Sequence, residues 1–272
     1  DNPTDYFAFA HEISTIDGVM YGFPFVGDAL VGIANSDFSD LNFDSWDEIR
    51  NEKTPLFFAA NSPQAIYFIS QYQSTGGTLR NGQGHAAVSS DSLMAVLDSF
   101  EKNVHNKLYQ ESFSSLNTYE EVWALLENGS VKWEINWYSK AMQSNLSGLQ
   151  VFQIPSLGKD AFVSAKGWLW TIINTGMEEG EIVPKFISFF SDPQFLADYS
   201  QASGYLPVLN KSLALYKETD LDGQLNNLLN AAHALPENDL ILELGPVFRD
   251  ATLMVLSQDY SNEEILQRVQ SQ

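Results

Sequence analysis

Residues 186–208, FISFFSDPQFLADYSQASGYLPV, restrict how this chain can fold more than any other stretch. Asp192 and Pro193 end one helical pattern and begin another, because an Asp side chain can cap a helix and proline is tolerated at its first position. Gly204 and Pro207 then stop the second run. The stretch predicts two consecutive helices that lead into an extended segment.

The composition excludes several classes of function. The 272 residues include 35 acidic and only 14 basic side chains, for a net charge of −21. Nucleic acids and anionic membranes attract clustered Lys and Arg, so neither is expected as a partner. The chain has no cysteine, which removes disulfides, thiolate metal sites and cysteine nucleophiles. No run of about eighteen apolar residues is present to suggest a membrane span.

Strand and helix patterns alternate over most of the chain, which predicts an α/β fold with largely parallel strand order. The expected strands are Tyr21–Phe25, Pro55–Ala60, Val131–Trp137, Phe152–Pro155 and Trp168–Ile173. The expected helices are Tyr6–Glu12, Gln64–Gln73, Ser90–His105, Thr118–Glu127 and Met177–Phe190. The last third predicts helices only, namely Leu221–Ala234, Leu242–Gln258 and a tail helix that begins at Ser261.

Short local signals fix several of these boundaries. Asp17-Gly18 between apolar residues is typical of a hairpin turn. A capping box, in which a hydroxyl and a Glu three residues later satisfy each other's backbone amides, is predicted at three positions: Ser45 with Glu48, Thr118 with Glu121, and Ser261 with Glu264.

Several segments occur in the order found in the family 1 extracellular solute-binding proteins, the receptors of sugar-importing ABC transporters. They are IDGVMYGFPF at 16–25, LVGIANSD at 30–37, SWDEI at 45–49, AKGWLW at 165–170 and GYLPV at 204–208. Each is loose alone, but together they resemble that family over nearly the whole chain.

The resemblance implies a two-lobed α/β fold of the periplasmic-binding-protein type II kind. Family members usually carry a further segment before the one at 16–25, so the N-terminal lobe is expected to be incomplete, with weakened ligand binding and exposed apolar surface. The C-terminal lobe is expected to carry additional late helices. By this pattern residues 1–28 plus 163–210 form the N-terminal lobe, and residues 29–162 plus 211–272 the C-terminal lobe.

No enzyme motif stands out. The four histidines are scattered without the pairing of a metal site, and no GxSxG, phosphate-binding loop or GxGxxG is present. We therefore expect no catalytic residues, no metal and no cofactor.

Aromatic residues are the first candidates for binding a ligand. Trp137 and Tyr138 end the strand VKWEINW, at the family position where a ring stacks under a sugar; a core Trp at a strand end is the equal alternative. Gly167 and Trp168 resemble a family segment that reaches the cleft. Alternation puts Trp168 and Trp170 on one face of their strand, and Trp168 is the better candidate for the ligand.

Polar candidates complete the predicted site. Asp28 lies at a crossover where the family often places a carboxylate or hydroxyl against the sugar, although a solvated turn would also suit it. Asn61 and Gln64 follow an expected strand, where α/β sheets bind ligands or where helix capping uses such side chains. Arg249 lies among apolar residues and needs a partner, which is either structural or a ligand, and we favour a structural one.

The predicted function is an extracytoplasmic receptor of an ABC importer, which binds a sugar or oligosaccharide between its lobes and docks on a membrane permease. A receptor for another small polar solute and a carbohydrate-active hydrolase are the alternatives. A third interpretation is a helical interaction module built on residues 213–272.

Overall fold

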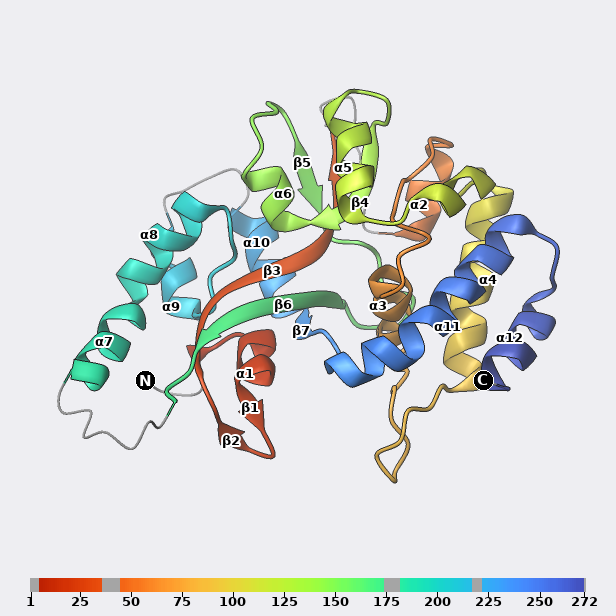
Figure 1. Ribbon diagram of the computed structural model, residues 1–272. Coiled ribbons are helices and arrows are strands. Elements are labelled where there is room, and N and C mark those ends of the chain that lie inside the picture. Colours follow the sequence, from red (N-terminus) through yellow and green to blue (C-terminus); the bar gives the residue numbers. More distant parts are fainter. Residues whose placement is uncertain (1–4, 36–44, 174–181, 217–221, 272) are drawn as a thin grey trace. The chain divides into compact units, whose positions relative to one another are not determined.

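The computed structural model describes residues 5–35, 45–173, 182–216 and 222–271 (Figure 1). The chain forms two compact units. Unit 1 contains residues 1–29, 138–145 and 163–235, and unit 2 contains residues 30–137, 146–162 and 236–272. Compared with the two predicted lobes, the first unit additionally takes in residues 138–145 and 211–235.

Unit 1 is built on a small mixed sheet. The first part of β3 (Phe23–Ala34) pairs antiparallel with β6 (Val163–Trp170), and β6 pairs parallel with β7 (Ala232–Ala234). Helix α1 (Ala8–Ser14) packs on β6 and β7 (Figure 1). Gly167 permits this packing, because a Cβ at that position would lie 2.6 Å from Ile13 Cδ1.

The helices of unit 1 confirm the prediction for residues 186–208. Helix α7 (Ile182–Phe190) is followed by α8 (Pro193–Ser203), and Asp192 Oδ1 accepts a hydrogen bond of 2.9 Å from the Phe195 amide. Gly204 ends α8 with a φ of 72°. The extended exit is also present, since Leu206 exchanges two backbone hydrogen bonds with Gly27 of β3. The described part of the unit also contains α6 (Tyr138–Met142), α9 (Asn210–Leu213) and α10 (Asp222–Asn230).

Unit 2 combines a second sheet with a group of packed helices. Residues 30–34 of β3 pair antiparallel with β4 (Trp133–Trp137) and with β5 (Gln150–Phe152). The helices α3 (Ile66–Ser74), α4 (Ser90–His105), α11 (Asn238–Ser257) and α12 (Asn262–Gln270) pack together, and α5 (Tyr119–Glu127) packs on β4 (Figure 1). The unit also contains α2 (Trp46–Asn51) and a 3₁₀ turn, η3 (Glu111–Ser115). Its core is rich in buried rings, among them Phe58, Tyr67, Phe100, Tyr109 and Phe113.

The predictions from short-range signals are confirmed. β1 (Thr15–Ile16) and β2 (Val19–Met20) form an antiparallel hairpin whose turn residues, Asp17 and Gly18, have φ values of 51° and 77°. All three capping boxes form, at Ser45, Thr118 and Ser261.

The predicted strand order is wrong. Among the strands of the described residues, only β6 and β7 pair parallel, whereas β3 is antiparallel to β4, β5 and β6. The sequence shows where strands lie but not their direction, which the connections in the folded chain determine.

Three predicted elements also differ from the structure. Pro55–Ala60 is not a strand: Phe57 makes a single bridge to Glu134, and the Ala60 amide already turns back to the Phe58 carbonyl. The final third is not purely helical, because α10 ends at Asn230 and β7 follows. The strand predicted at Tyr21–Phe25 continues as β3 to Ala34. The start of the helix predicted at Met177–Phe190 lies outside the described residues.

Large exposed apolar side chains are concentrated in unit 1. They include Ile16, Val19, Tyr21, Trp168, Trp170, Ile172, Ile173, Ile182, Phe186 and Phe189. These positions agree with the apolar surface expected on residues 1–28 and 163–210. None of the helices within the described ranges is long and apolar enough to cross a membrane.

Candidate ligand-binding residues

Asp28 lies in β3 with its carboxylate buried and bound by protein donors. Oδ1 accepts hydrogen bonds from the amides of Ala29 (3.1 Å) and Ser139 (3.0 Å), and Oδ2 accepts one from Ser139 Oγ (2.8 Å). The ammonium of Lys166 on β6 lies 3.8 Å from Oδ2. Burial raises the pKa of the Asp28 carboxyl, and the Ser139 amide and Lys166 oppose that shift. Asp28 therefore holds the start of α6 against the sheet of unit 1.

Tyr138 is the first residue of α6 and is buried. Burial raises the pKa of its hydroxyl well above the usual value, and the nearby charge of Asp28 adds to the shift. The phenol is consequently neutral across the physiological range, where it can donate or accept a hydrogen bond.

Trp168 presents the most accessible aromatic surface among the predicted site residues. It is 44% exposed, and its ring lies against that of Tyr205 with centroids 4.9 Å apart and planes inclined by 58°. Trp168 lies opposite Val26 in the sheet, and its neighbour Gly167 lies opposite Gly27. Because neither glycine has a Cβ, the side chains of Phe9 and Ile13 in α1 can approach the sheet closely here.

Trp137 ends β4 in unit 2 and is 9% exposed. Its ring packs on Tyr119 at 5.8 Å, and its amide donates to the side chain of Asn136. Asn136 in turn donates to the Tyr119 carbonyl and to Glu134. A buried polar network therefore fixes the end of this strand.

Asn61 and Gln64 lie in the loop before α3. Asn61 donates to Asn117 Oδ1 (2.8 Å), and its amide donates to the Leu116 carbonyl, which places it beside the start of α5. Gln64 is exposed. Neither caps α3, because its N-cap is Ala65 in the left-handed conformation, with no side-chain hydrogen bond.

Arg249 lies in α11, one turn after Gly245, a residue that approaches the Gln64 backbone closely. Its guanidinium donates two hydrogen bonds to Oδ1 of the adjacent Asp250, at 2.9 and 2.6 Å. This ion pair gives the half-buried arginine a partner within the protein.

The structure thus divides the eight candidates between the two units. Asp28, Tyr138, Gly167 and Trp168 gather around β3 and β6 in unit 1. Asn61, Gln64, Trp137 and Arg249 belong to unit 2. Sequence reasoning missed Ser139 and Tyr205, although Tyr205 lies inside the GYLPV segment that it singled out. No sequence signal connects either residue with its partner, since both pairs form only in the folded chain.

The described residues contain no group of three or more His, Asp or Glu side chains that could hold a metal ion. Some of their carboxylates cap helices, as at Asp192, and others pair with arginines, as at Asp250.

Comparison with known protein families gives one match that covers most of the chain. The family described as bacterial extracellular solute-binding protein matches residues 2–225. This chain belongs to that family. Proteins of this kind bind a solute without converting it, so the expectation that the chain is not an enzyme is confirmed. No curated protein matches the chain.

Solved structures of sugar-binding proteins share the fold. The sugar-binding protein MalE from Xanthomonas citri is similar with a TM-score of 0.78 at 16% identity, over 99% of this chain and 74% of its own. The cyclic alpha-maltosyl-1,6-maltose binding protein from Arthrobacter globiformis has a TM-score of 0.76 at 18% identity, over 99% and 75%. Maltose-bound MalE3 from T. maritima has a TM-score of 0.74 at 17% identity, over 99% and 76%.

These similarities confirm the predicted fold class, an α/β periplasmic-binding-protein fold. The identities are low, so the likeness concerns the fold, and the solute must be argued from the residues of this chain.

Proposed function

We propose that this chain is the extracytoplasmic substrate receptor of an ABC importer and that its solute is a sugar or oligosaccharide. Membership of the solute-binding family supports the receptor role. The exposed ring of Trp168, which lies against the half-buried ring of Tyr205, supports a sugar.

A sugar carries two kinds of surface, and each needs a different partner. The C–H face of a pyranose packs on an aromatic ring, and ring contacts of this kind contribute about 1 kcal/mol each. The hydroxyls around the edge need donors and acceptors, and a site built to satisfy them rejects a sugar that lacks one. Trp168 and Tyr205 of unit 1 offer the rings.

The net charge favours a neutral solute over an anionic one. At −21 the protein repels anions at long range, whereas an uncharged sugar approaches without that penalty. Names of structural neighbours point the same way, since they include maltose-bound and maltosyl-maltose-binding proteins.

The proposal gives the other candidates distinct roles. Trp168 stacks on the ligand directly. Asp28 acts through Ser139, and so positions Tyr138 and α6 in unit 1. Trp137, largely covered by its packing on Tyr119, contributes only its exposed edge. Arg249 serves the structure through Asp250.

The test is calorimetric titration of the whole chain with a panel of neutral sugars, charged sugars and amino acids. We expect heat of binding with at least one neutral sugar, weakened by Trp168→Ala and by Tyr205→Ala. Binding of an amino acid with no response to any sugar would overturn the assignment of the solute. The same mixtures, analysed chromatographically after long incubation, should contain unchanged sugar.

A further inference from the structure

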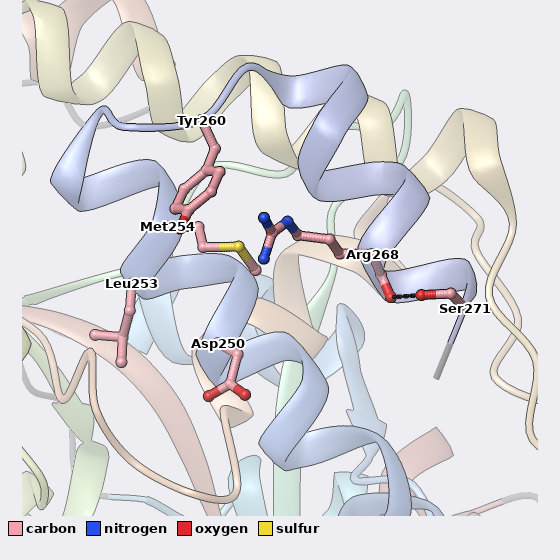
Figure 2. A pocket seen from close by; sticks show the side chains of 6 residues that line it. All are labelled: Asp250, Leu253, Met254, Tyr260, Arg268 and Ser271. Atoms are coloured by element: carbon pink, nitrogen blue, oxygen red, sulfur yellow. Dashed lines mark hydrogen bonds between the residues drawn. The ribbon is translucent and has the colours of Figure 1, made fainter.

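A surface hollow lies in unit 2, between α11, α12 and the turn that joins them (Figure 2). Its volume is about 540 Å³. Asp250, Leu253 and Met254 of α11, Tyr260 of the turn, and Arg268 and Ser271 at the end of α12 line it. None of the eight predicted site residues is among them.

One wall of the hollow consists of a stacked pair. The guanidinium of Arg268 lies over the ring of Tyr260, 4.4 Å from its centroid, and Figure 2 shows it reaching from α12 toward Met254. Stacking fixes the plane of the guanidinium while its N–H groups remain at the edge. Within the described residues that guanidinium donates no hydrogen bond, so its donors are available to a ligand.

The remaining lining is half apolar and half polar. Leu253 and Met254 are half-buried and offer an apolar surface. Within the part of the chain that the structure describes, Asp250 is bound by Arg249 through Oδ1 alone, and Oδ2 is left as an acceptor. The Ser271 hydroxyl donates to the Arg268 carbonyl and keeps its own acceptor capacity.

We propose that this hollow is an accessory binding site for a neutral sugar ring. An apolar sugar face would lie on Leu253, Met254 and the exposed part of Tyr260. Its hydroxyls would accept from Arg268 and donate to Asp250, which is the combination that an alcohol can satisfy at once.

Charge selects against the other classes of small ligand. An anion would gain Arg268 but would meet Asp250 in the same hollow and Glu264, whose carboxyl feels the charge of Arg268 one turn away. A cation would gain Asp250 but would meet the guanidinium of Arg268 in the same hollow. A hydroxyl-bearing ligand without charge is repelled by none of them, so the lining fits it best.

The experiment uses Met254 as a probe inside the hollow. The chain has five methionines, so a sample labelled at the methionine methyls gives few NMR signals, and Met254→Leu assigns the relevant one. Maltose is titrated into the millimolar range, with glucuronate as an anionic comparator and glycine as a zwitterionic one. We expect the Met254 signal to move with maltose and to move less with either comparator.

Two lining variants and one matched control carry the argument further. Arg268→Gln and Tyr260→Ala should each weaken the maltose response of Met254 by about tenfold, the loss expected for a charge-assisted hydrogen bond or a stacking surface. Gln267→Ala changes an exposed residue of α12 outside the lining and should leave the response unchanged.

A Met254 signal that stays fixed at saturating maltose would overturn the proposal without needing any variant. A larger response to glucuronate than to maltose would overturn the sugar assignment. The accessory site and the proposed receptor function fail separately, because Trp168→Ala should leave the Met254 response intact while it weakens calorimetric binding.

Discussion

Asp28 and Ser139 are joined by two hydrogen bonds, from the Ser139 amide to Oδ1 at 3.0 Å and from its hydroxyl to Oδ2 at 2.8 Å. The pair ties β3 to the first turn of α6 inside unit 1, although 111 positions separate the two residues in the chain. The carboxylate is 1% exposed, so no water can replace either partner.

Replacing Asp28 by alanine should therefore be costly. The change leaves the amides of Ala29 and Ser139 without an acceptor in a buried position, and the free energy of unfolding should fall by about 2–3 kcal/mol. Asp28→Asn keeps one acceptor oxygen and a similar shape, and should cost about 1 kcal/mol. Urea unfolding followed by circular dichroism measures both.

The pH dependence of the unfolding free energy of these variants tests whether the pKa of Asp28 is raised in the folded protein. Burial raises the pKa of this carboxyl from its ordinary value of 3.8. A carboxyl whose pKa is higher in the folded protein than in the unfolded one stabilises the fold at pH values below its unfolded pKa. That contribution is lost as pH rises through its folded pKa. The loss of unfolding free energy caused by Asp28→Asn should thus be larger near pH 4 than near pH 7. A deficit that grows toward neutral pH would contradict this account.

A second ionisable pair joins α1 to β7. His233 Nδ1 lies 3.0 Å from Glu12 Oε1, and the Ala234 amide donates to Glu12 Oε2 at 2.7 Å. The hydrogen bond to Glu12 raises the His233 pKa above 6.5, against the effect of burial. Burial opposes ionisation of Glu12, but His233, the Ala234 amide and the nearby charge of His11 together lower its pKa below 4.5.

The two shifts define a pH window of maximal stabilisation. The contribution of His233 to stability is complete below pH 6.5 and is lost as pH rises through its folded pKa. The contribution of Glu12 is present above pH 4.5 and is lost as pH falls through its folded pKa. His233→Gln should lower stability by at most about 1 kcal/mol between these values, since both side chains are partly exposed. The difference should shrink near pH 9.

Melting temperatures recorded across that pH range test the pair. His85→Gln, which removes an exposed histidine from a loop of unit 2, is the matched control and should show no such dependence. If the deficit of His233→Gln is the same at every pH, the pair contributes through packing alone.

Predictions from neighbouring residues succeed in this chain because their physics is local. Each capping box needs only a hydroxyl and a Glu three residues apart, and the structure has all three. The same holds for Asp192 and Pro193 at the start of α8. Both partners of such contacts lie within one turn, so the fold as a whole cannot alter them.

β3 shows why the remainder could not be predicted. Nearly all of its twelve residues are buried, so the alternation that identifies a half-exposed strand is absent. Glycine in a sequence often indicates a loop, but Gly27 and Gly32 lie inside this strand. The ring of Phe9 occupies the place of a Cβ at Gly27, and the ring of Phe152 does so at Gly32. The strands that pair with β3 come from distant segments of the chain. Ser139 is distant as well, and it binds the Asp28 carboxylate that was predicted to bind a sugar.

The candidate site follows the same division. Alternation puts Trp168 and Trp170 on one face of their strand, and both are partly exposed there. Tyr205, the partner of Trp168, comes from another segment, and only the structure brings the two together.

Replacing Gly245 by alanine should destabilise the protein, although the same change inside a helix normally stabilises it. Gly→Ala inside a helix normally stabilises by about 1 kcal/mol. In α11, however, a Cβ at this position would lie 2.5 Å from the Pro63 carbonyl oxygen and 3.1 Å from Gln64 Cα. Gly245→Ala should therefore destabilise by about 1–3 kcal/mol, because the loop that carries Gln64 must shift.

Gly82→Ala is the control, since no atom lies within 4 Å of its Cβ position. Chemical denaturation of both variants compares the two sites. Equal stability of Gly245→Ala and the unchanged protein would show that the loop before α3 moves at little cost.

Trp168 and Trp170 provide the sharpest test of the proposed function, because they differ in packing rather than in residue type. Both are partly exposed on β6. Trp170, however, contacts the rings of Phe25, Phe186 and Phe190, with centroids 5.3–5.8 Å apart, whereas Trp168 has Tyr205 beside it at 4.9 Å.

Trp168→Ala should weaken sugar binding by about tenfold, which corresponds to the loss of a stacked ring, and should change the unfolding free energy by less than about 1 kcal/mol. Trp170→Ala should do the reverse: it removes the centre of an aromatic cluster and should cost about 2–3 kcal/mol of stability, with little change in affinity at temperatures where it stays folded. Calorimetry and denaturant unfolding on the same two samples separate the effects. Equal loss of affinity in both variants would mean that Trp168 makes no contact with the ligand that Trp170 lacks. Unchanged affinity in Trp168→Ala would mean that the sugar binds elsewhere on this chain.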